Sequence, residues 1–322
     1  MELREAIIRT VCYFDLFDFP LSRAEIRDRL YGSDAGAHEV DAAVATLLGS
    51  KILKEENDFI SLSDRDGLSA VRAERKIFSD RKWKRARTWA RIFAALPDVE
   101  LVGVGNTLAY DTAKDGSDID FFIVTAPGAV WRTRFFCATV AALFDLRPKA
   151  NDNRDKLCLS FFATSEALDM SRFSCHCDER TNERPLGMLE TSRGNLAGDA
   201  PKVDIYMYYW TRQMTPLAGK PSAFELFRIA NRGASRQLSW ASAREKIGRS
   251  LFLRVLLSPL ALLPGSFMRA WQKRHFPQAL LEAEARHDGS VIISDSVLKF
   301  HVNDRRADIY DRWQKRVKSI LT

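Results

Sequence analysis

Two short apolar segments near the middle of the chain constrain the fold most. Val99 to Gly103 and Asp118 to Thr125 are too short for typical helices and rich in β-branched and aromatic residues, so they predict two strands. The sequence between them predicts a helical stretch from Thr107 to about Ala113 and a polar turn over 114–117. We therefore expect a strand, a short helix and a second strand at the centre of the protein.

Two acids one residue apart open the second of these strands. Because side chains alternate between the two faces of a strand, Asp118 and Asp120 share one face while Ile119 and Phe121 point into the core. Carboxylate oxygens suit hard divalent cations, so the pair predicts a site for Mg²⁺ or Mn²⁺. The alternative is an ordinary strand that a Gly-Ser-Asp turn opens, with Asp118 as a turn residue.

A glycine-containing segment precedes the acids at a defined spacing. Gly103-Val104-Gly105-Asn106 is followed by eleven residues and then by Asp118-Ile119-Asp120-Phe121. This pattern resembles the signature of the polymerase-beta-type nucleotidyltransferase superfamily: an apolar strand ending in Gly-Gly or Gly-Ser, a short helix, and a strand with two acids. The resemblance implies a small mixed-sheet core and the transfer of a nucleoside monophosphate from an NTP to a hydroxyl acceptor, which the sequence does not identify.

The resemblance also implies roles for individual residues. Asp118 and Asp120 would be the catalytic acids and the metal ligands, and Gly105, Asn106 and Ser117 would contact the nucleotide. A glycine at the end of the first strand lets the backbone approach phosphates. Asn106 stands where the family has Ser or Gly, and its amide can still donate a hydrogen bond to a phosphate oxygen.

One acid of the family pattern is absent. Polymerase-beta-type enzymes generally place a third carboxylate on the next core strand, yet the strand predicted from Lys156 to Ala163 contains no acid. Asp152 and Asp155 precede this strand and Asp204 opens a later segment, so each is a candidate for the missing ligand. The absence keeps a second function open, a non-catalytic module that senses a nucleotide or binds DNA or a protein.

Residues 1–65 have the pattern of three helices followed by a hairpin. We expect helices from Leu3 to Phe17, from Ser22 to Tyr31 with a capping box, and over an apolar repeat that ends near Gly49. A hairpin over 52–62 follows, and this order resembles a winged helix-turn-helix domain. The third helix carries a single basic side chain, which favours packing or protein contact over the reading of DNA.

A long basic helix is expected over 66–96, between this domain and the centre of the chain. Between positions 72 and 91, basic side chains alternate with aromatic ones. The pattern is typical of a solvated face over an aromatic inner stripe. A cationic surface for nucleic acid, or for the polyphosphate tail of a substrate, is the alternative. The basic residues are Arg72, Arg75, Lys76, Arg81, Lys82, Lys84, Arg85, Arg87 and Arg91.

The rest of the chain predicts an α+β protein with a nucleotidyltransferase-like core over 97–200 and a helical C-terminal region over 201–322. The apolar run Leu251 to Leu263 is too short to span a membrane and is expected to form a buried helix, with a surface-lying segment as the alternative.

The polar run over 298–306 precedes the last helix. It indicates helix capping and salt bridges, or side chains that bind a substrate phosphate. Its candidate phosphate ligands are Lys299, His301, Arg305 and Arg306. Further helices are expected over 128–147, 203–214, 223–247 and 306–320, and a loop over 180–201.

Composition places the protein among packed globular chains. Its 322 residues contain 49 Lys and Arg and 42 Asp and Glu, and the mild excess of +7 suits a phosphate-bearing partner without requiring one. Five cysteines, an odd number mostly within apolar runs, indicate buried thiols in a reducing compartment. Together with a first segment unlike a secretory signal, this predicts a cytoplasmic protein. Cys175-His176-Cys177 is interpreted as a loop or as buried thiols rather than a zinc site.

Overall fold

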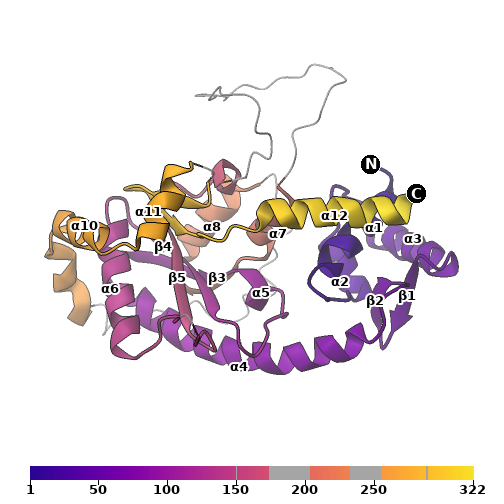
Figure 1. Cartoon of the computed structure of the whole chain (residues 1–322), viewed down its shortest axis with the longest axis horizontal. Helices are drawn as coiled ribbons and strands as arrows, with labels where there is room; N and C mark the ends of the chain where they lie inside the picture. The colour runs from indigo at the N-terminus through magenta and orange to yellow at the C-terminus, as the bar shows by residue number, and fades with distance from the viewer. Residues whose placement is uncertain (150, 174–203, 233–254, 288) are drawn as a thin grey trace, which may run out of the picture.

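The computed structural model is a mixed α+β protein built around one large sheet (Figure 1). It describes residues 1–149, 151–173, 204–232, 255–287 and 289–322. None of the helices in these ranges combines the length and apolar character that crossing a membrane requires. The expected α+β class is confirmed at this level.

The large sheet has six strands in the order β6-β3-β4-β5-β8-β7. β4 and β5 run parallel, and every other neighbouring pair is antiparallel. The two strands predicted at the centre of the chain therefore lie side by side within this sheet. The strands are β3 (Val99–Val104), β4 (Ile119–Thr125), β5 (Leu157–Thr164), β6 (Thr215–Gly219), β7 (Val291–Ile293) and β8 (Val297–Phe300).

The C-terminal region differs from its prediction. Residues 201–322 were expected to be helical, yet β6, β7 and β8 all come from this region and complete the sheet that the core begins. β8 pairs with β5 and buries Val297 and Leu298. The sequence did not predict this strand because Lys299 interrupts its apolar pattern and a lysine usually indicates an exposed position. In the structure Lys299 is buried, and its ammonium donates to the carbonyl oxygen of Gly289 at 2.6 Å.

Helices cover both faces of the sheet. On one face, α4 (Leu68–Ala94) and α6 (Val130–Leu143) enclose a core that contains Phe93, Val102 and Ile123. On the other face, α7 (Ile205–Gln213) and α8 (Pro221–Ala230) enclose a core around Phe122 and Trp210. The remaining elements of the middle and C-terminal parts are α5 (Asn106–Ala109), η1 (Met170–Phe173), η3 (Ser258–Leu262), α10 (Gly265–Arg274), α11 (Gln278–Ala285) and α12 (Arg306–Leu321).

The N-terminal unit follows the predicted order of three helices and a hairpin. Its elements are α1 (Leu3–Asp15), α2 (Arg23–Asp28), α3 (Ala37–Gly49), β1 (Leu53–Glu56) and β2 (Phe59–Leu62). The capping box between Ser22 and Glu25 is present, as the sequence predicts. α12 lies against α1, so the two ends of the chain meet (Figure 1). The indole nitrogen of Trp313 donates to the carbonyl oxygen of Arg9 at 2.9 Å across this contact.

The basic helix α4 runs along the molecule and joins the N-terminal unit to the sheet (Figure 1). Several of its cations are not solvated but paired with acids of the elements they join. Arg72 pairs with Glu25 at 2.7 Å, and the fully buried Lys82 pairs with Asp155 at 2.6 Å. The expectation of a solvated basic face is therefore wrong for these positions, where the cations connect one unit to the other.

Three further predictions have a different or a partial outcome. The helix expected from Thr107 to Ala113 is the single turn α5, which ends at Ala109. In the run expected as a buried helix over 251–263, residues 255–257 are helical and 258–262 form the short helix η3, but Val255 is 66% and Leu262 86% exposed, so the described part is helical and not buried. The helix expected over 223–247 is α8 in its described part. The loop over 180–201, the end of that helix and Cys175-His176-Cys177 lie outside the described residues.

Candidate functional site

β4 and β5 bring three potential metal ligands together. Asp118 lies directly before β4, Asp120 lies within it, and Cys158 is the register partner of Asp120 on β5. One ligand atom from each side chain lies within 4.8 Å of the other two. Ile119 is buried in the core, as the predicted alternation requires. The parallel register therefore places a thiol beside the two acids, on the strand where a third carboxylate was expected.

The surroundings of Asp118 and Asp120 disfavour the ionised form of both carboxyl groups. Burial, and then the charge of Asp118, raise the pKa of Asp120 to about 7. Burial also raises the pKa of Asp118, and burial followed by the two carboxylates raises that of the Cys158 thiol. Within the described part of the chain, no Lys, Arg or His forms an ion pair with either acid. A bound cation would supply the missing countercharge.

The three acids considered as the third ligand have other partners. The carboxylate of Asp155 accepts from Lys82 at 2.6 Å, and that of Asp152 pairs with Lys156 at 3.0 Å. Asp204 caps α7 through the backbone N–H of Met207 at 2.9 Å. All three carry structural ion pairs or caps, and none belongs to the cluster that Asp118, Asp120 and Cys158 form.

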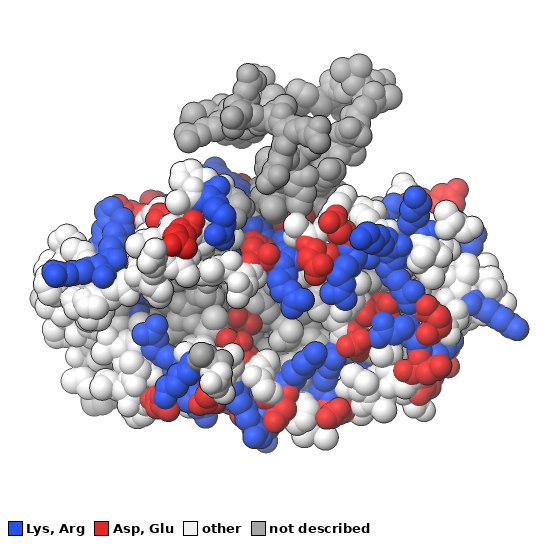
Figure 2. All heavy atoms as spheres, in the orientation of Figure 1, with Lys and Arg blue, Asp and Glu red and all other residues white. Residues whose placement is uncertain are grey.

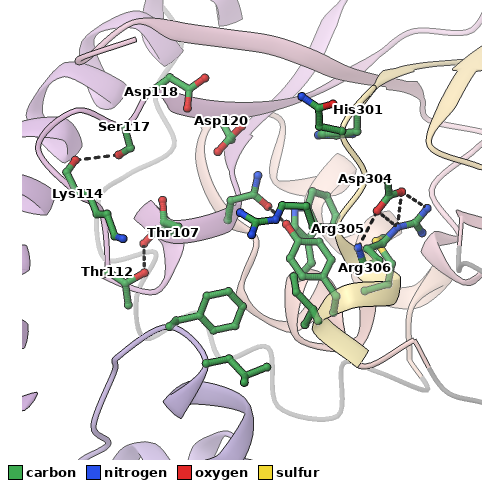
Figure 3. Close-up of a pocket in the computed structure, with 18 of the residues that line it drawn as sticks. Thr107, Thr112, Lys114, Ser117, Asp118, Asp120, His301, Asp304, Arg305 and Arg306 are labelled. Atoms are coloured by element: carbon green, nitrogen blue, oxygen red, sulfur yellow. Dashed lines mark hydrogen bonds and ion pairs between the residues drawn. The ribbon is translucent and has the colours of Figure 1, made fainter. Parts of the chain in front are cut away.

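A cavity of about 650 Å³ opens beside the acid pair. Its walls come from distant parts of the chain: α5 and β4 on one side, the end of α1 on another, and the segment that leads into α12 on a third (Figure 3). Leu16 and Phe17 from the N-terminal unit, and Ile309 from α12, give it an apolar wall. A volume of this size is typical of sites for small molecules and cofactors.

Two cations at the cavity have no acidic partner in the described structure. Lys114 and Arg305 are exposed, line the cavity and form no ion pair there. Their charged ends point toward each other across the space beside the acids (Figure 3). Lys299 and Arg306, by contrast, are buried structural cations, and Arg306 pairs with Asp204 at 3.2 Å. Of the candidates in the polar run, Arg305 is the one that faces the cavity with an unpaired charge.

In the structure, Gly105 and Asn106, two of the residues expected to contact the nucleotide, contact side chains of α7. A Cβ on Gly105 would lie 2.6 Å from the indole nitrogen of Trp210, so this glycine permits the close packing of α7 on the strand end. Asn106 has a left-handed backbone (φ 53°), and its Oδ1 accepts from the Tyr206 hydroxyl at 2.6 Å. The same side chain lowers the pKa of Asp120 by hydrogen bonding. Asn106 therefore orients a candidate metal ligand.

Ser117 and His301 also line the cavity. The Ser117 hydroxyl donates to the carbonyl oxygen of Lys114 at 2.9 Å and stabilises the turn before the acids. The Nε2 atom of His301 lies 3.4 Å from the Ser160 hydroxyl, while its Nδ1 is buried without a hydrogen-bond partner among the described residues. Burial lowers the pKa of His301 to about 4, so the imidazole is neutral near pH 7.

Sequence reasoning missed five of these contributors: Cys158, Lys114, Tyr206, Leu16 and Phe17. The strand of Cys158 was identified, and its alignment with β4 would have revealed the thiol. Lys114 belongs to the polar turn that the sequence predicts directly before the acids, and its position there was the available signal. Tyr206, Leu16 and Phe17 have no local signal, since the tertiary structure alone brings them to the acids. Comparison with protein-family models, with curated proteins and with solved structures finds no match for this chain.

Proposed function

We propose that the protein is a nucleotidyltransferase that moves a nucleoside monophosphate from an NTP to a hydroxyl acceptor, with Mg²⁺ or Mn²⁺. One observation carries the proposal: Asp118 and Asp120 lie together beside a cavity whose lining includes Lys114 and Arg305, two cations without an ion pair among the described residues. Two carboxylates with substrate phosphates are the usual protein setting for Mg²⁺. The local pattern that resembles the polymerase-beta-type superfamily agrees with this chemistry.

Each group has a part in the proposed reaction. The carboxylate oxygens of Asp118 and Asp120 fit a divalent cation, whose chemistry is to activate the attacking hydroxyl and to stabilise the leaving pyrophosphate. Lys114 and Arg305 bind the triphosphate from opposite sides of the cavity, where their charges offset those of the phosphate oxygens. Asn106 keeps Asp120 in place through its hydrogen bonds, and Ser117 fixes the turn that presents Asp118.

The acceptor is proposed to enter along the apolar wall. Leu16 and Phe17 come from the unit that resembles a winged helix, so this unit contributes to the substrate cavity. Cations from 72–91 are less suited to nucleic acid, because Arg72, Arg75 and Lys82 already pair with acids of the protein. Lys and Arg are interspersed with Asp and Glu on the face shown in Figure 2. A small hydroxylated molecule is therefore the acceptor class that we favour.

Thermal unfolding with each NTP, with and without Mg²⁺ or Mn²⁺, tests the nucleotide site. A ligand at 100 times its Kd adds about 2.7 kcal/mol to the free energy of unfolding, which a melt resolves. We expect a metal-dependent stabilisation by at least one NTP in the wild type and in the control Asp152→Asn, and its loss in Asp118→Asn. Equal stabilisation of all three proteins would remove Asp118 from the site.

A second candidate function is nucleotide sensing without turnover, and Cys158 favours it. A thiol in place of the third carboxylate weakens the position that activates the acceptor hydroxyl, while the phosphate-binding cations are unaffected. A pyrophosphate-release assay on protein that the melt shows to bind an NTP separates the two functions. Release with added hydroxyl acceptors supports transfer, and stable binding with no release across an acceptor panel supports sensing.

A further inference from the structure

We propose that Asp118, Asp120 and Cys158 form a three-ligand centre that prefers a sulfur-accepting divalent cation, of the Zn²⁺ and Co²⁺ class, over Mg²⁺. The proposal deepens the proposed function by replacing the cation that the two acids alone suggest, Mg²⁺ or Mn²⁺, with one that also accepts sulfur. It rests on the proposed function only for the substrate oxygen that would complete the coordination. The ligand set itself depends on the fold, because the parallel register of β4 and β5 aligns Cys158 with Asp120.

The geometry of the three donors suits one cation. Donors around a Zn²⁺-sized ion lie about 3.5 Å from one another, since each metal–ligand distance is about 2.0–2.3 Å. The observed separations, all within 4.8 Å, need only small side-chain rotations to reach this arrangement. Two oxygens and one sulfur leave a position open for substrate, as catalytic metal sites with three protein ligands generally do.

The chemistry of the donors sets the preference. Mg²⁺ takes oxygen ligands and rarely sulfur, whereas thiolate favours softer cations, and the affinity of mixed sites rises from Mn²⁺ through Co²⁺ toward Cu²⁺. When the cation binds, the S–H bond of Cys158 breaks, a sulfur–metal bond forms, and the proton leaves to solvent. The two carboxylates lose no proton when already ionised, so their charges remain available to the cation.

Ser160 and His301, which lie outside the three-ligand cluster, support its assignment as a metal site. The Cys158 thiol donates to the Ser160 hydroxyl at 3.2 Å, and that oxygen lies 3.4 Å from Nε2 of His301. Outer partners of this kind orient metal ligands. Independently of these bonds, Nδ1 of His301 is buried without a partner in the described structure, and the residue lines the same cavity. It is placed to accept or donate a hydrogen bond to a molecule held beside the acids.

Titration with Co²⁺ alone gives a readout that needs no nucleotide. A thiolate ligand produces a sulfur-to-cobalt charge-transfer band in the near ultraviolet. The measurement uses the full chain with Cys175→Ser and Cys177→Ser, because those neighbouring thiols lie outside the described residues and could bind the probe. We expect the band in this background and in the added control Cys137→Ser, because the Cys137 thiol lies on α6 and is buried in the core.

Adding Cys158→Ser is expected to abolish the band and to weaken Co²⁺ binding at least about tenfold, since even outer partners of ligands contribute 10–100-fold. Cys158→Asp keeps three donors and is expected to lose the band while gaining Mg²⁺ affinity, which a Mg²⁺-dependent melt measures. This second variant also tests the proposal if the serine variant fails to fold.

Absence of the band in the background protein, or its survival in Cys158→Ser, would overturn the proposal. These outcomes differ from failure of the proposed function. A band that depends on Cys158, with no NTP binding under any cation, supports the metal centre and removes the nucleotidyltransferase. NTP transfer with Mg²⁺ at equal rates in wild type and Cys158→Ser, with no band, supports the nucleotidyltransferase and removes the three-ligand centre.

Discussion

Lys82 offers the sharpest test of how the helix α4 supports the site. Its side chain is fully buried, and its ammonium donates to the carbonyl oxygens of Asp115 at 3.0 Å and Ser117 at 2.7 Å. It also pairs with Asp155 at 2.6 Å. These bonds fix the turn that leads directly into Asp118. Replacement by methionine keeps the volume of the side chain and removes all three interactions.

The expected loss follows from these contacts. Removal of one partner from a buried ion pair costs about 3–5 kcal/mol. Arg81 still pairs with Asp155 at 2.9 Å in the Lys82→Met variant, so the lower end applies, about 3 kcal/mol. Lys84→Met is the matched control on an exposed position of the same helix, where the change stays within about 0.5 kcal/mol. Urea unfolding measures both.

The pH dependence of this difference adds a second readout. Hydrogen bonds from Lys82 and Arg81 outweigh burial and hold the pKa of Asp155 below its ordinary value of 3.8. A lowered pKa contributes stability that is present above pH 4 and is lost as the pH falls through the folded-state pKa. The gap between wild type and Lys82→Met should therefore narrow in acid. A loss no larger than that of Lys84→Met, or a gap that widens in acid, would refute the reasoning.

Three further predictions test the site. Asp120→Asn should be more stable than the cation-free wild type at pH 8 in thermal melts: the pKa of Asp120 is raised to about 7, and stability from a raised pKa is lost as the pH rises through it. Equal melting temperatures at pH 5 and pH 8 in the wild type would contradict this. Gly105→Ala should cost about 1–3 kcal/mol in urea unfolding, because its Cβ overlaps the Trp210 indole, and Gly116→Ala, where nothing lies within 4 Å, should cost less. Tyr206→Phe should cost about 1 kcal/mol and reduce NTP stabilisation by freeing Asn106, and an unchanged nucleotide shift would argue against that role.

Local sequence rules predicted the elements whose signal lies within a few residues. The capping box at Ser22 and the period-two alternation at Asp118 and Asp120 depend on neighbours only, and both appear where the sequence placed them. Strand β8 was missed because Lys299 interrupts its apolar pattern. The hydrogen bond from the buried Lys299 ammonium to the carbonyl oxygen of Gly289 cannot be predicted from local sequence. The exposed Leu262 was misjudged because an apolar run alone does not say which surface covers it.

Predicting the candidate site met the same limit. The acid pair is encoded locally, but the thiol reaches it through the register of a parallel strand pair, and parallel pairing has no short turn to fix it in sequence. The wall formed by Leu16 and Phe17 depends on an even longer-range contact, that of α12 with α1.

That contact links the two ends of the chain to the chemistry of the site. Arg316 on α12 pairs with Asp15 at the end of α1 and with Asp64 beyond the hairpin, at 3.0 and 2.6 Å. Immediately after Asp15, the chain enters the cavity wall, and the N-terminal end of α12 supplies Ile309 to the same wall. One helix thus holds the N-terminal unit and closes the cavity. Because the acids lie on the rigid sheet while this wall depends on packing between helices, movement of the N-terminal unit would change access for the acceptor before it changed the metal ligands.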